Sequence, residues 1–255
     1  MTSFEDHFSE YAREYARHRP QYPSELFGYL ASISPNHQLA WDCGTGNGQA
    51  ALELVKHFDR VIATDASSDQ IAQAVSHERI EYRVERAEEV SLEDLSVDLV
   101  TVAIAIHWFD LEAFYQVVRR VVRPEGILAV WMYHLPVIDS SIDQTLNHYY
   151  TNVVAGFWPE RFHFMEERYQ TLPFPFEELN PPEFEMQAKW NLGQLVGFLG
   201  SWSATRRYQK ERGQNPVRII WPRLSETWGE PGQRRTIRWP LYLRVGRITS
   251  PEHLP

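Results

Sequence analysis

The sequence has 255 residues, with 25 basic and 34 acidic side chains and a formal net charge of −9. This acidity excludes a general electrostatic attraction to nucleic acid or to anionic membranes. The length is sufficient for one large domain with a full apolar core. The single cysteine excludes an internal disulfide, and no cysteine and histidine cluster has the spacing of a zinc site.

The first residues lack the basic start and apolar middle of a signal peptide, and no apolar run approaches the length that spans a membrane. We therefore expect a soluble, cytoplasmic protein. We also expect it to act on a small molecule as a monomer or weak homodimer, without nucleic acid, membrane or metal partners.

Aromatic side chains recur at helical spacing before the first predicted strand. One face of a helix would carry Phe4, Phe8, Tyr11 and Tyr15. A proline-containing stretch at residues 19–23 interrupts this pattern. The segment precedes the predicted sheet in the chain, so it is free to cover a ligand there, although packing alone would explain Phe4 and Phe8.

The functional interpretation depends on residues 39–49. An apolar run ends at Asp42, and a glycine then follows at every second position, at Gly44, Gly46 and Gly48, before a helical apolar pattern begins. This order predicts a strand, a tight turn and a helix. Glycine lets a ligand approach the backbone, and the free N–H groups of the next helix point at that ligand. The turn is a predicted nucleotide-type site, although such a turn can also be a simple connection.

A second predicted strand, at residues 61–64, ends in Asp65. A carboxylate there suits a ribose, whose two hydroxyl groups donate to an acceptor-only side chain. An NAD-dependent oxidoreductase would share this acid, but it would need the G-x-G-x-x-G spacing and a Ser/Tyr/Lys-type catalytic constellation, which we do not find. The D-x-G-x-G-x-G pattern followed by Asp65 resembles motif I and the ribose acid of class I S-adenosylmethionine (SAM) dependent methyltransferases.

This resemblance implies that SAM is the cofactor and S-adenosylhomocysteine the product. It also implies a set of cofactor-binding residues, namely Asp42, Gly44, Gly46, Gly48 and Asp65.

Two further stretches resemble a methyltransferase subgroup related to trans-aconitate methyltransferase. The string YARHRPQYP resembles its leader, which implies that Tyr15 and Arg19 close over SAM near the methionine carboxylate. Ala87 and Glu88 match an Ala-Glu pair after the third predicted strand, which implies that both lie along the adenine. Arg86 stands where the subgroup often has an aspartate. The contact to the adenine amino group would then pass to Glu88.

A nearly continuous apolar run at residues 97–106 is typical of a strand buried on both faces of a parallel sheet. Its carboxyl end carries His107, Trp108 and Phe109, and in open α/β sheets this end faces the ligand crevice. The string AIHWFD differs at one aliphatic position from the ALHWFD of the same subgroup. The resemblance implies that Ala103 lies at the cofactor and that His107 and Trp108 contact the substrate.

His107 is also a candidate catalytic residue. A neutral imidazole accepts a proton from a hydroxyl nucleophile or donates a hydrogen bond to a carboxylate substrate. A carboxylate is already a nucleophile, so its methylation needs alignment and exclusion of water rather than a base. A local structural role is the alternative. Ile104 replaces a glutamine that is frequent in the subgroup, which removes one polar contact.

After a fifth predicted strand at residues 127–132, aromatic residues and prolines become frequent, which predicts a cap with its own small core. Within it we predict a core helix at residues 138–150 and a strand at residues 184–190. Trp202 and Arg206 fall in a stretch that resembles the substrate-covering W-S segment of the same subgroup. A guanidinium group can hold a carboxylate in a bidentate pair.

Together these patterns predict an α/β fold with a Rossmann-like seven-stranded mixed sheet in the order 3-2-1-4-5-7-6, a last antiparallel strand and an inserted α-helical and aromatic cap. Residues 1–135 would form the SAM-binding core with an N-terminal lid helix. Residues 136–235 would form the cap and substrate region, including one core helix and strand. Residues 236–255 would supply the final strand and tail.

The predicted activity is transfer of a methyl group from SAM to an oxygen of a small molecule, with a carboxylate such as trans-aconitate as first choice. A phenol, quinone or lipid-like acceptor is an alternative, because an aromatic cap suits a flat apolar ring. A SAM-binding protein without catalysis is another.

Overall fold

The computed structural model describes residues 20–249 of the chain. Tyr15, Arg19 and the expected lid helix lie outside the described residues. Contact clustering divides the chain into two compact units. In the described range, the sheet unit comprises residues 22–133, 163–184 and 241–249, and the helical unit comprises residues 20–21, 134–162 and 185–240.

The sheet unit alternates strands and helices in its first half. Its elements there are α2 (Ser24–Ile33), β1 (Leu39–Cys43), α3 (Gln49–Leu54), β2 (Arg60–Asp65), α4 (Ser68–Ile71), β3 (Ile80–Val84), β4 (Val97–Ala103), the 3-10 turn η1 (Ile106–Trp108), α5 (Leu111–Val121) and β5 (Val122–Tyr133). Later segments add α7 (His163–Glu166), β6 (Glu177–Leu179) and the end of β8 (Arg235–Arg247).

The sheet has the order β3-β2-β1-β4-β5-β8-β6, with β7 (Phe184–Trp190) also paired to β8. The first five strands are parallel, and β8 runs antiparallel to β5. The predicted Rossmann-like sheet with its last strand antiparallel is confirmed. The predicted sixth strand is β7, and the short strand β6 is an eighth strand that the sequence pattern did not indicate.

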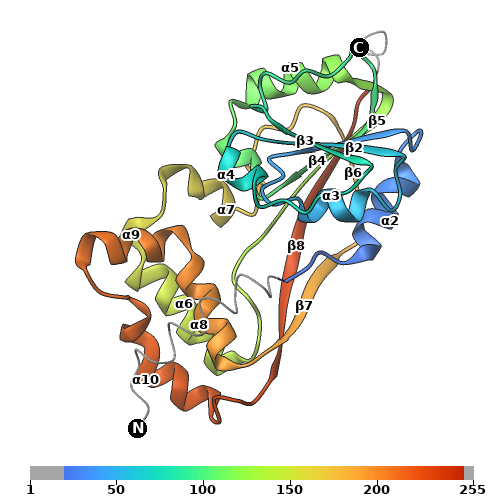
Figure 1. Ribbon diagram of the computed structural model, residues 1–255. Coiled ribbons are helices and arrows are strands. Elements are labelled where there is room, and N and C mark those ends of the chain that lie inside the picture. Colours follow the sequence, from blue (N-terminus) through green and yellow to red (C-terminus); the bar gives the residue numbers. More distant parts are fainter. Residues whose placement is uncertain (1–19, 250–255) are drawn as a thin grey trace. The chain divides into compact units, whose positions relative to one another are not determined.

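Burial explains why these segments form strands. Every residue from Ile127 to Met132 of β5 has no solvent exposure, as expected for a strand covered on both faces. α5 begins at its N-cap Asp110, whose carboxylate accepts from the Ala113 N–H, and it buries Phe114 and Val118. In Figure 1, α5 lies on the opposite face of the sheet from α2 and α3.

The segment between α7 and β6 belongs to the sheet unit, although we expected residues 136–235 to form the cap. Side chains of α5 and β8 hold it by its backbone. Tyr115 donates to the Pro173 carbonyl (2.5 Å), and Arg244 donates to the carbonyls of Tyr169 (2.9 Å) and Leu172 (2.6 Å). These contacts join residues that are far apart in the sequence.

The helical unit contains the short turns η2 (Tyr149–Val153), η3 (Ala155–Phe157) and η4 (Glu160–Phe162). Its helices are α6 (Ser140–His148), α8 (Leu192–Ser201), α9 (Ser203–Arg212) and α10 (Val217–Trp228). The predicted core helix at residues 138–150 corresponds to α6, which lies in this unit rather than with the sheet. None of the helices in residues 20–249 is long and apolar enough to cross a bilayer.

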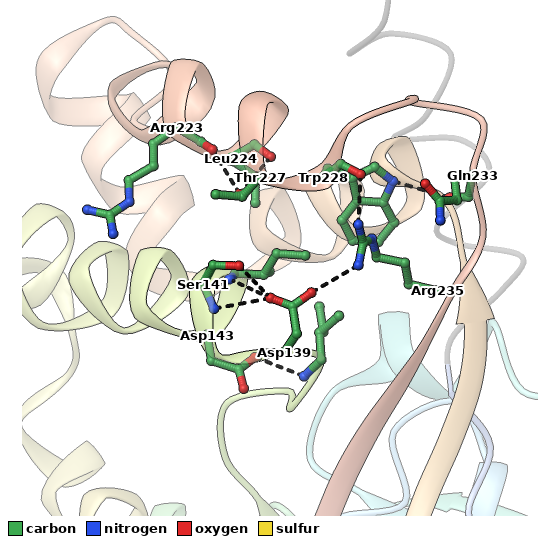
Figure 2. A network of polar contacts seen from close by, with 11 residues as sticks. Asp139, Ser141, Asp143, Arg223, Leu224, Thr227, Trp228, Gln233 and Arg235 are labelled. Carbon is green, nitrogen blue, oxygen red and sulfur yellow. Dashed lines mark hydrogen bonds and ion pairs between the residues drawn. The ribbon is translucent and has the colours of Figure 1, made fainter.

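A polar network fixes the start of α6 (Figure 2). Asp139 is the N-cap and accepts from the N–H groups of Ser141 and Ile142, and Arg235 donates to its other oxygen at 3.0 Å. Arg235 also donates to the carbonyl of Trp228 at 3.0 Å. One arginine therefore joins the first turn of α6, the end of α10 and the beginning of β8.

Candidate functional site

The glycine turn joins the carboxyl end of β1 to α3. Gly44, Gly46 and Gly48 have φ angles of 69°, 57° and 85°, a conformation that side chains disfavour. A Cβ on Gly44 would lie 2.5 Å from the Cβ of Ala105, whereas a Cβ on Gly46 would have its nearest neighbour, a Gln70 oxygen, at 3.8 Å. The turn is thus tightly packed at Gly44 and open at Gly46. A cofactor approaching the backbone would find space at Gly46.

Asp42, the acid before the turn, is fully buried at the end of β1. Its carboxylate accepts from the hydroxyls of Thr45 (2.5 Å) and Thr101 (2.8 Å). Burial raises the pKa of Asp42 to about 6, against the lowering effect of these two hydrogen bonds. In this position Asp42 orders the turn and links it to β4, so any contribution to cofactor binding passes through the turn.

Asp65, at the end of β2, is the acid that we expect to bind a ribose. One carboxylate oxygen accepts from the Gly46 N–H at 2.9 Å, and the other accepts from the Ser67 N–H at 2.8 Å. An ionised carboxylate has about four acceptor positions, so these bonds leave capacity for a diol. This remaining acceptor capacity fits the two hydroxyl donors of the ribose of SAM, and the bond from the Gly46 N–H ties the acid to the glycine turn.

Ala87 and Glu88 occupy a turn after β3, closed by a bridge between Arg86 and Glu89. Ala87 is buried. The Glu88 carboxylate accepts from the Asp110 N–H at 2.8 Å, and its side chain is 13% exposed. Glu88 therefore connects the turn after β3 with the segment after β4. Whether either residue contacts the adenine stays a prediction.

The carboxyl end of β4 packs against the glycine turn. Ala103 is the last residue of the strand, and Ile104 follows with φ of 55°, its N–H donating to the Trp131 carbonyl. A side chain on Gly44 would meet both Ala105 and Phe109. The segment that carries His107 therefore approaches the turn at both of its ends, at Ala105 and at Phe109.

His107 is 3% exposed and lies in η1, and its Nδ1 is 2.8 Å from the hydroxyl oxygen of Tyr169. Tyr169 has no solvent exposure, and burial raises its pKa well above the ordinary value, so the phenol keeps its proton. Trp108 is half exposed, with its ring 4.9 Å from the imidazole. Sequence reasoning missed Tyr169 because no local motif marks a residue 62 positions away as the partner of His107.

Trp202 and Arg206 lie in the helical unit. Trp202 lies between α8 and α9, and its ring is 5.7 Å from those of Trp158 and Phe198 and 5.8 Å from that of Tyr149. Arg206 is exposed on α9. Their expected contacts with substrate stay predictions. In residues 20–249, no cluster of three or more His, Cys, Asp or Glu side chains is arranged to hold a metal ion.

Comparison with known proteins identifies relatives of this chain and its fold. Residues 41–130 match a family model described as a methyltransferase domain. The chain is 31% identical over 230 residues to a candidate methyltransferase from Dictyostelium discoideum, covering 89% of this chain and 86% of that protein. It is 33% identical over 141 residues to the Saccharomyces cerevisiae protein CRG1, a candidate S-adenosylmethionine-dependent methyltransferase, covering 52% of this chain and 48% of CRG1.

Among solved structures, a candidate type II methyltransferase from Anaeromyxobacter dehalogenans superposes with a TM-score of 0.85. Its sequence is 41% identical, and the match covers 91% of this chain and 99% of that chain. The likeness extends well beyond the glycine turn, since both long matches include residues outside the family model. Several other relatives match over about half of their own length.

Proposed function

Because the chain belongs to the family of class I SAM-dependent methyltransferases, we propose that it methylates an oxygen of a small molecule, with a carboxylate as first choice. The observation that carries this proposal is His107, which is buried in η1 between the two residues that pack on Gly44, Ala105 and Phe109, and is hydrogen-bonded to Tyr169. In this proposal, His107 would recognise the oxygen of the acceptor close to the turn that would bind the cofactor.

SAM supplies a methyl group on a positively charged sulfur, which transfers to a nucleophile and leaves S-adenosylhomocysteine. In our proposal Asp65 accepts from the ribose hydroxyls, and the backbone at Gly46 lies along the cofactor. Glu88 and Ala87 contact the adenine. Asp42 keeps the turn in its conformation through Thr45.

The acceptor chemistry follows from charge. A carboxylate is ionised at pH 7 and carries its own nucleophilic electrons, so the protein needs only to orient it and exclude water. His107 would hold such an acceptor by hydrogen bonding. The AIHWFD resemblance makes a small polycarboxylate of the trans-aconitate kind the first acceptor to test.

A phenol, quinone or lipid-like acceptor is a second candidate, favoured by the aromatic cluster of the helical unit. There the rings of Trp158 and Phe162 are stacked 4.5 Å apart, and Trp202 packs on Trp158. The faces of these aromatic side chains can stack on a flat apolar ring of a ligand in the same way as they stack on each other.

One experiment separates the candidates. The purified protein is incubated with methyl-labelled SAM and a panel of small carboxylic acids and phenols, and each product is treated with mild alkali. A carboxylate acceptor gives a methyl ester, which releases labelled methanol. A phenol gives an ether, which keeps the label. Tight SAM binding with no transfer to any acceptor would instead favour a binding protein without catalysis.

The assignment of Asp65 is tested by Asp65→Ala. Removing a charged acceptor from the ribose should weaken SAM binding about 10- to 100-fold, measured by calorimetric titration. Asp69→Ala, which removes an exposed acid from the first turn of α4, is the matched control and should leave the affinity unchanged. Equal affinity of the Asp65→Ala and wild-type proteins would refute the ribose assignment.

A further inference from the structure

The hydrogen bond between Tyr169 and His107 carries information about the proton of the imidazole. Both side chains are buried, and the Tyr169 hydroxyl lies 2.8 Å from His107 Nδ1. In the described part of the chain, this nitrogen is the one hydrogen-bonding partner of the hydroxyl. A buried O–H left without an acceptor is strongly unfavourable. The hydroxyl therefore donates, and Nδ1 of the neutral imidazole accepts.

We propose that Tyr169 is a positioning residue that fixes His107 in the tautomer with its proton on Nε2. The imidazole then donates a hydrogen bond from Nε2–H to the methyl acceptor. A neutral imidazole whose Nδ1 accepts must carry its proton on Nε2. Any group that hydrogen-bonds Nε2 must then supply an acceptor atom. The inference rests on the proposed function, in which His107 contacts the acceptor.

The backbone of Tyr169 is held firmly enough for this role. Arg168 and Tyr169 have φ angles of 54° and 60°, a conformation that residues with side chains keep only where the surroundings enforce it. Arg244 supplies that constraint, because one of its terminal nitrogens donates to the carbonyls of both Tyr169 and Leu172. Its remaining nitrogens pair with Glu178 of β6.

The neighbouring backbone is also tied to α5. Tyr115 and Arg119 of α5 donate to the carbonyls of Pro173 and Pro175. The guanidinium of Arg244 lies 4.6 Å from the ring centre of Phe174. The hydroxyl of Tyr169 is thus presented to His107 by a segment anchored at several points.

This arrangement refines the substrate class. An Nε2–H donor stabilises an oxygen that is already anionic, and it cannot remove a proton from a hydroxyl. The tautomer therefore favours a carboxylate, or another acceptor ionised in solution, over an alcohol that requires a base. It also defines His107 as a binding group whose loss affects affinity for the acceptor.

The test is nuclear magnetic resonance of the full-length protein labelled with nitrogen-15 in histidine. His107→Gln identifies the His107 signals by their absence. In the wild type we expect Nδ1 in the unprotonated range and Nε2 in the protonated range at neutral pH. Tyr169→Phe removes one oxygen, and we expect the Nδ1 signal to shift to the value of an imidazole that exchanges between tautomers.

Tyr115→Phe is the matched control, because it removes the hydroxyl of another buried tyrosine that binds the same segment but does not contact His107. We expect its His107 signals to match those of the wild type. Once an acceptor that the protein methylates has been found, Tyr169→Phe should raise KM for that acceptor about 5- to 15-fold and leave KM for SAM unchanged.

A proton on Nδ1 in the wild type, or identical His107 signals in the wild type and Tyr169→Phe, would overturn the inference. The wild-type spectrum needs no variant, so a folding defect in Tyr169→Phe cannot obscure the answer. If no acceptor is methylated, the proposed function fails, but the tautomer of the resting protein still decides this inference.

Discussion

The two units differ in where they place unfavourable backbone conformations. The described non-glycine residues with positive φ all lie in the sheet unit, and they are Leu95, Ile104, Glu125, Arg168 and Tyr169. In the described part of the helical unit, positive φ occurs at Gly213 and Gly229, which follow α9 and α10. The described helical unit has positive φ at glycines alone, whereas the sheet unit has it at the glycines of the turn and also imposes it on residues with side chains. Ile104 and Tyr169 show that part of this strain lies at the candidate site.

The two units also hold acidic side chains differently. Asp98 of the sheet unit is fully buried, pairs with Arg123 at 2.9 Å, and accepts from the backbone at the start of β1. Asp139 of the helical unit also accepts two backbone N–H groups and pairs with Arg235, but its side chain is 36% exposed. Water can replace a lost partner at Asp139, and it cannot do so at Asp98.

The largest effect should come from Asp98→Ala. The substitution leaves Arg123 and the N–H groups of Gln38 and Leu39 without their acceptor, and we expect the free energy of unfolding to fall by about 3 to 5 kcal/mol. Urea unfolding followed by tryptophan fluorescence measures it. Asp94→Ala, which breaks the exposed pair with Arg120, should cost less than about 1 kcal/mol. Similar losses in both variants would remove the distinction between buried and exposed acids.

The next effect is a pH dependence of stability that comes from Asp42. Burial raises the pKa of this carboxyl from 3.8 to about 6. A raised pKa favours the protonated folded state, so this contribution is fully present below the unfolded value and is lost as the pH rises through about 6. The loss corresponds to about 3 kcal/mol. Asp42→Asn should remove this pH dependence, and other acids contribute equally in both proteins. Parallel stability curves of wild type and variant between pH 4 and 7 would contradict the buried position of this carboxyl.

Sequence reasoning succeeded where the structural signal is local. The predicted strand at residues 184–190 has the bounds of β7, and the one predicted at residues 61–64 lies within β2, because alternating or continuous apolar runs define strands directly. The glycine turn and its following helix were predictable for the same reason. Which of these residues bind cofactor or substrate still depends on the predictions above.

The parts that were not predictable depend on contacts between distant residues. β6 has three residues, too few for a pattern, and it forms because β8 offers an edge to pair with. The segment that carries Tyr169 looks like any aromatic and proline-rich stretch, and its place in the sheet unit depends on Arg244. The pairing of His107 with Tyr169 could be found only in three dimensions.

A smaller effect is expected at Asp139 in the helical unit. Burial raises the pKa of this carboxyl, but hydrogen bonds from Ile142 and Ser141 and the charge of Arg235 outweigh it and lower the pKa below 3.8. Its contribution to stability is therefore present above pH 3.8 and lost as the pH falls through the lowered value. Asp139→Ala should cost about 1 to 2 kcal/mol, since it removes both the helix cap and the ion pair.

Asp139→Asn is the matched variant, because asparagine caps a helix well and lacks the charge. We expect it to cost less than about 1 kcal/mol, the range of a partly exposed ion pair. Urea unfolding at pH 7 compares the two substitutions. If Asp139→Asn were as damaging as Asp139→Ala, the ion pair with Arg235 would dominate over the cap, and the helical unit would resemble the sheet unit in its dependence on charge.

The smallest effect directly tests the difference in backbone strain. Ile104→Gly should relieve a conformation that disfavours a β-branched residue by about 1 to 2 kcal/mol, partly offset by the greater freedom of glycine in the unfolded chain. Ile104→Val keeps the β-branch and should keep the strain, so we expect the glycine variant to be more stable than the valine variant by about 0.5 to 1 kcal/mol. Gly213→Ala makes the reverse change at the end of α9 and should destabilise by about 1 kcal/mol. Thermal unfolding of the three variants orders them, and a valine variant more stable than the glycine variant would mean that the strain at Ile104 is absent in solution.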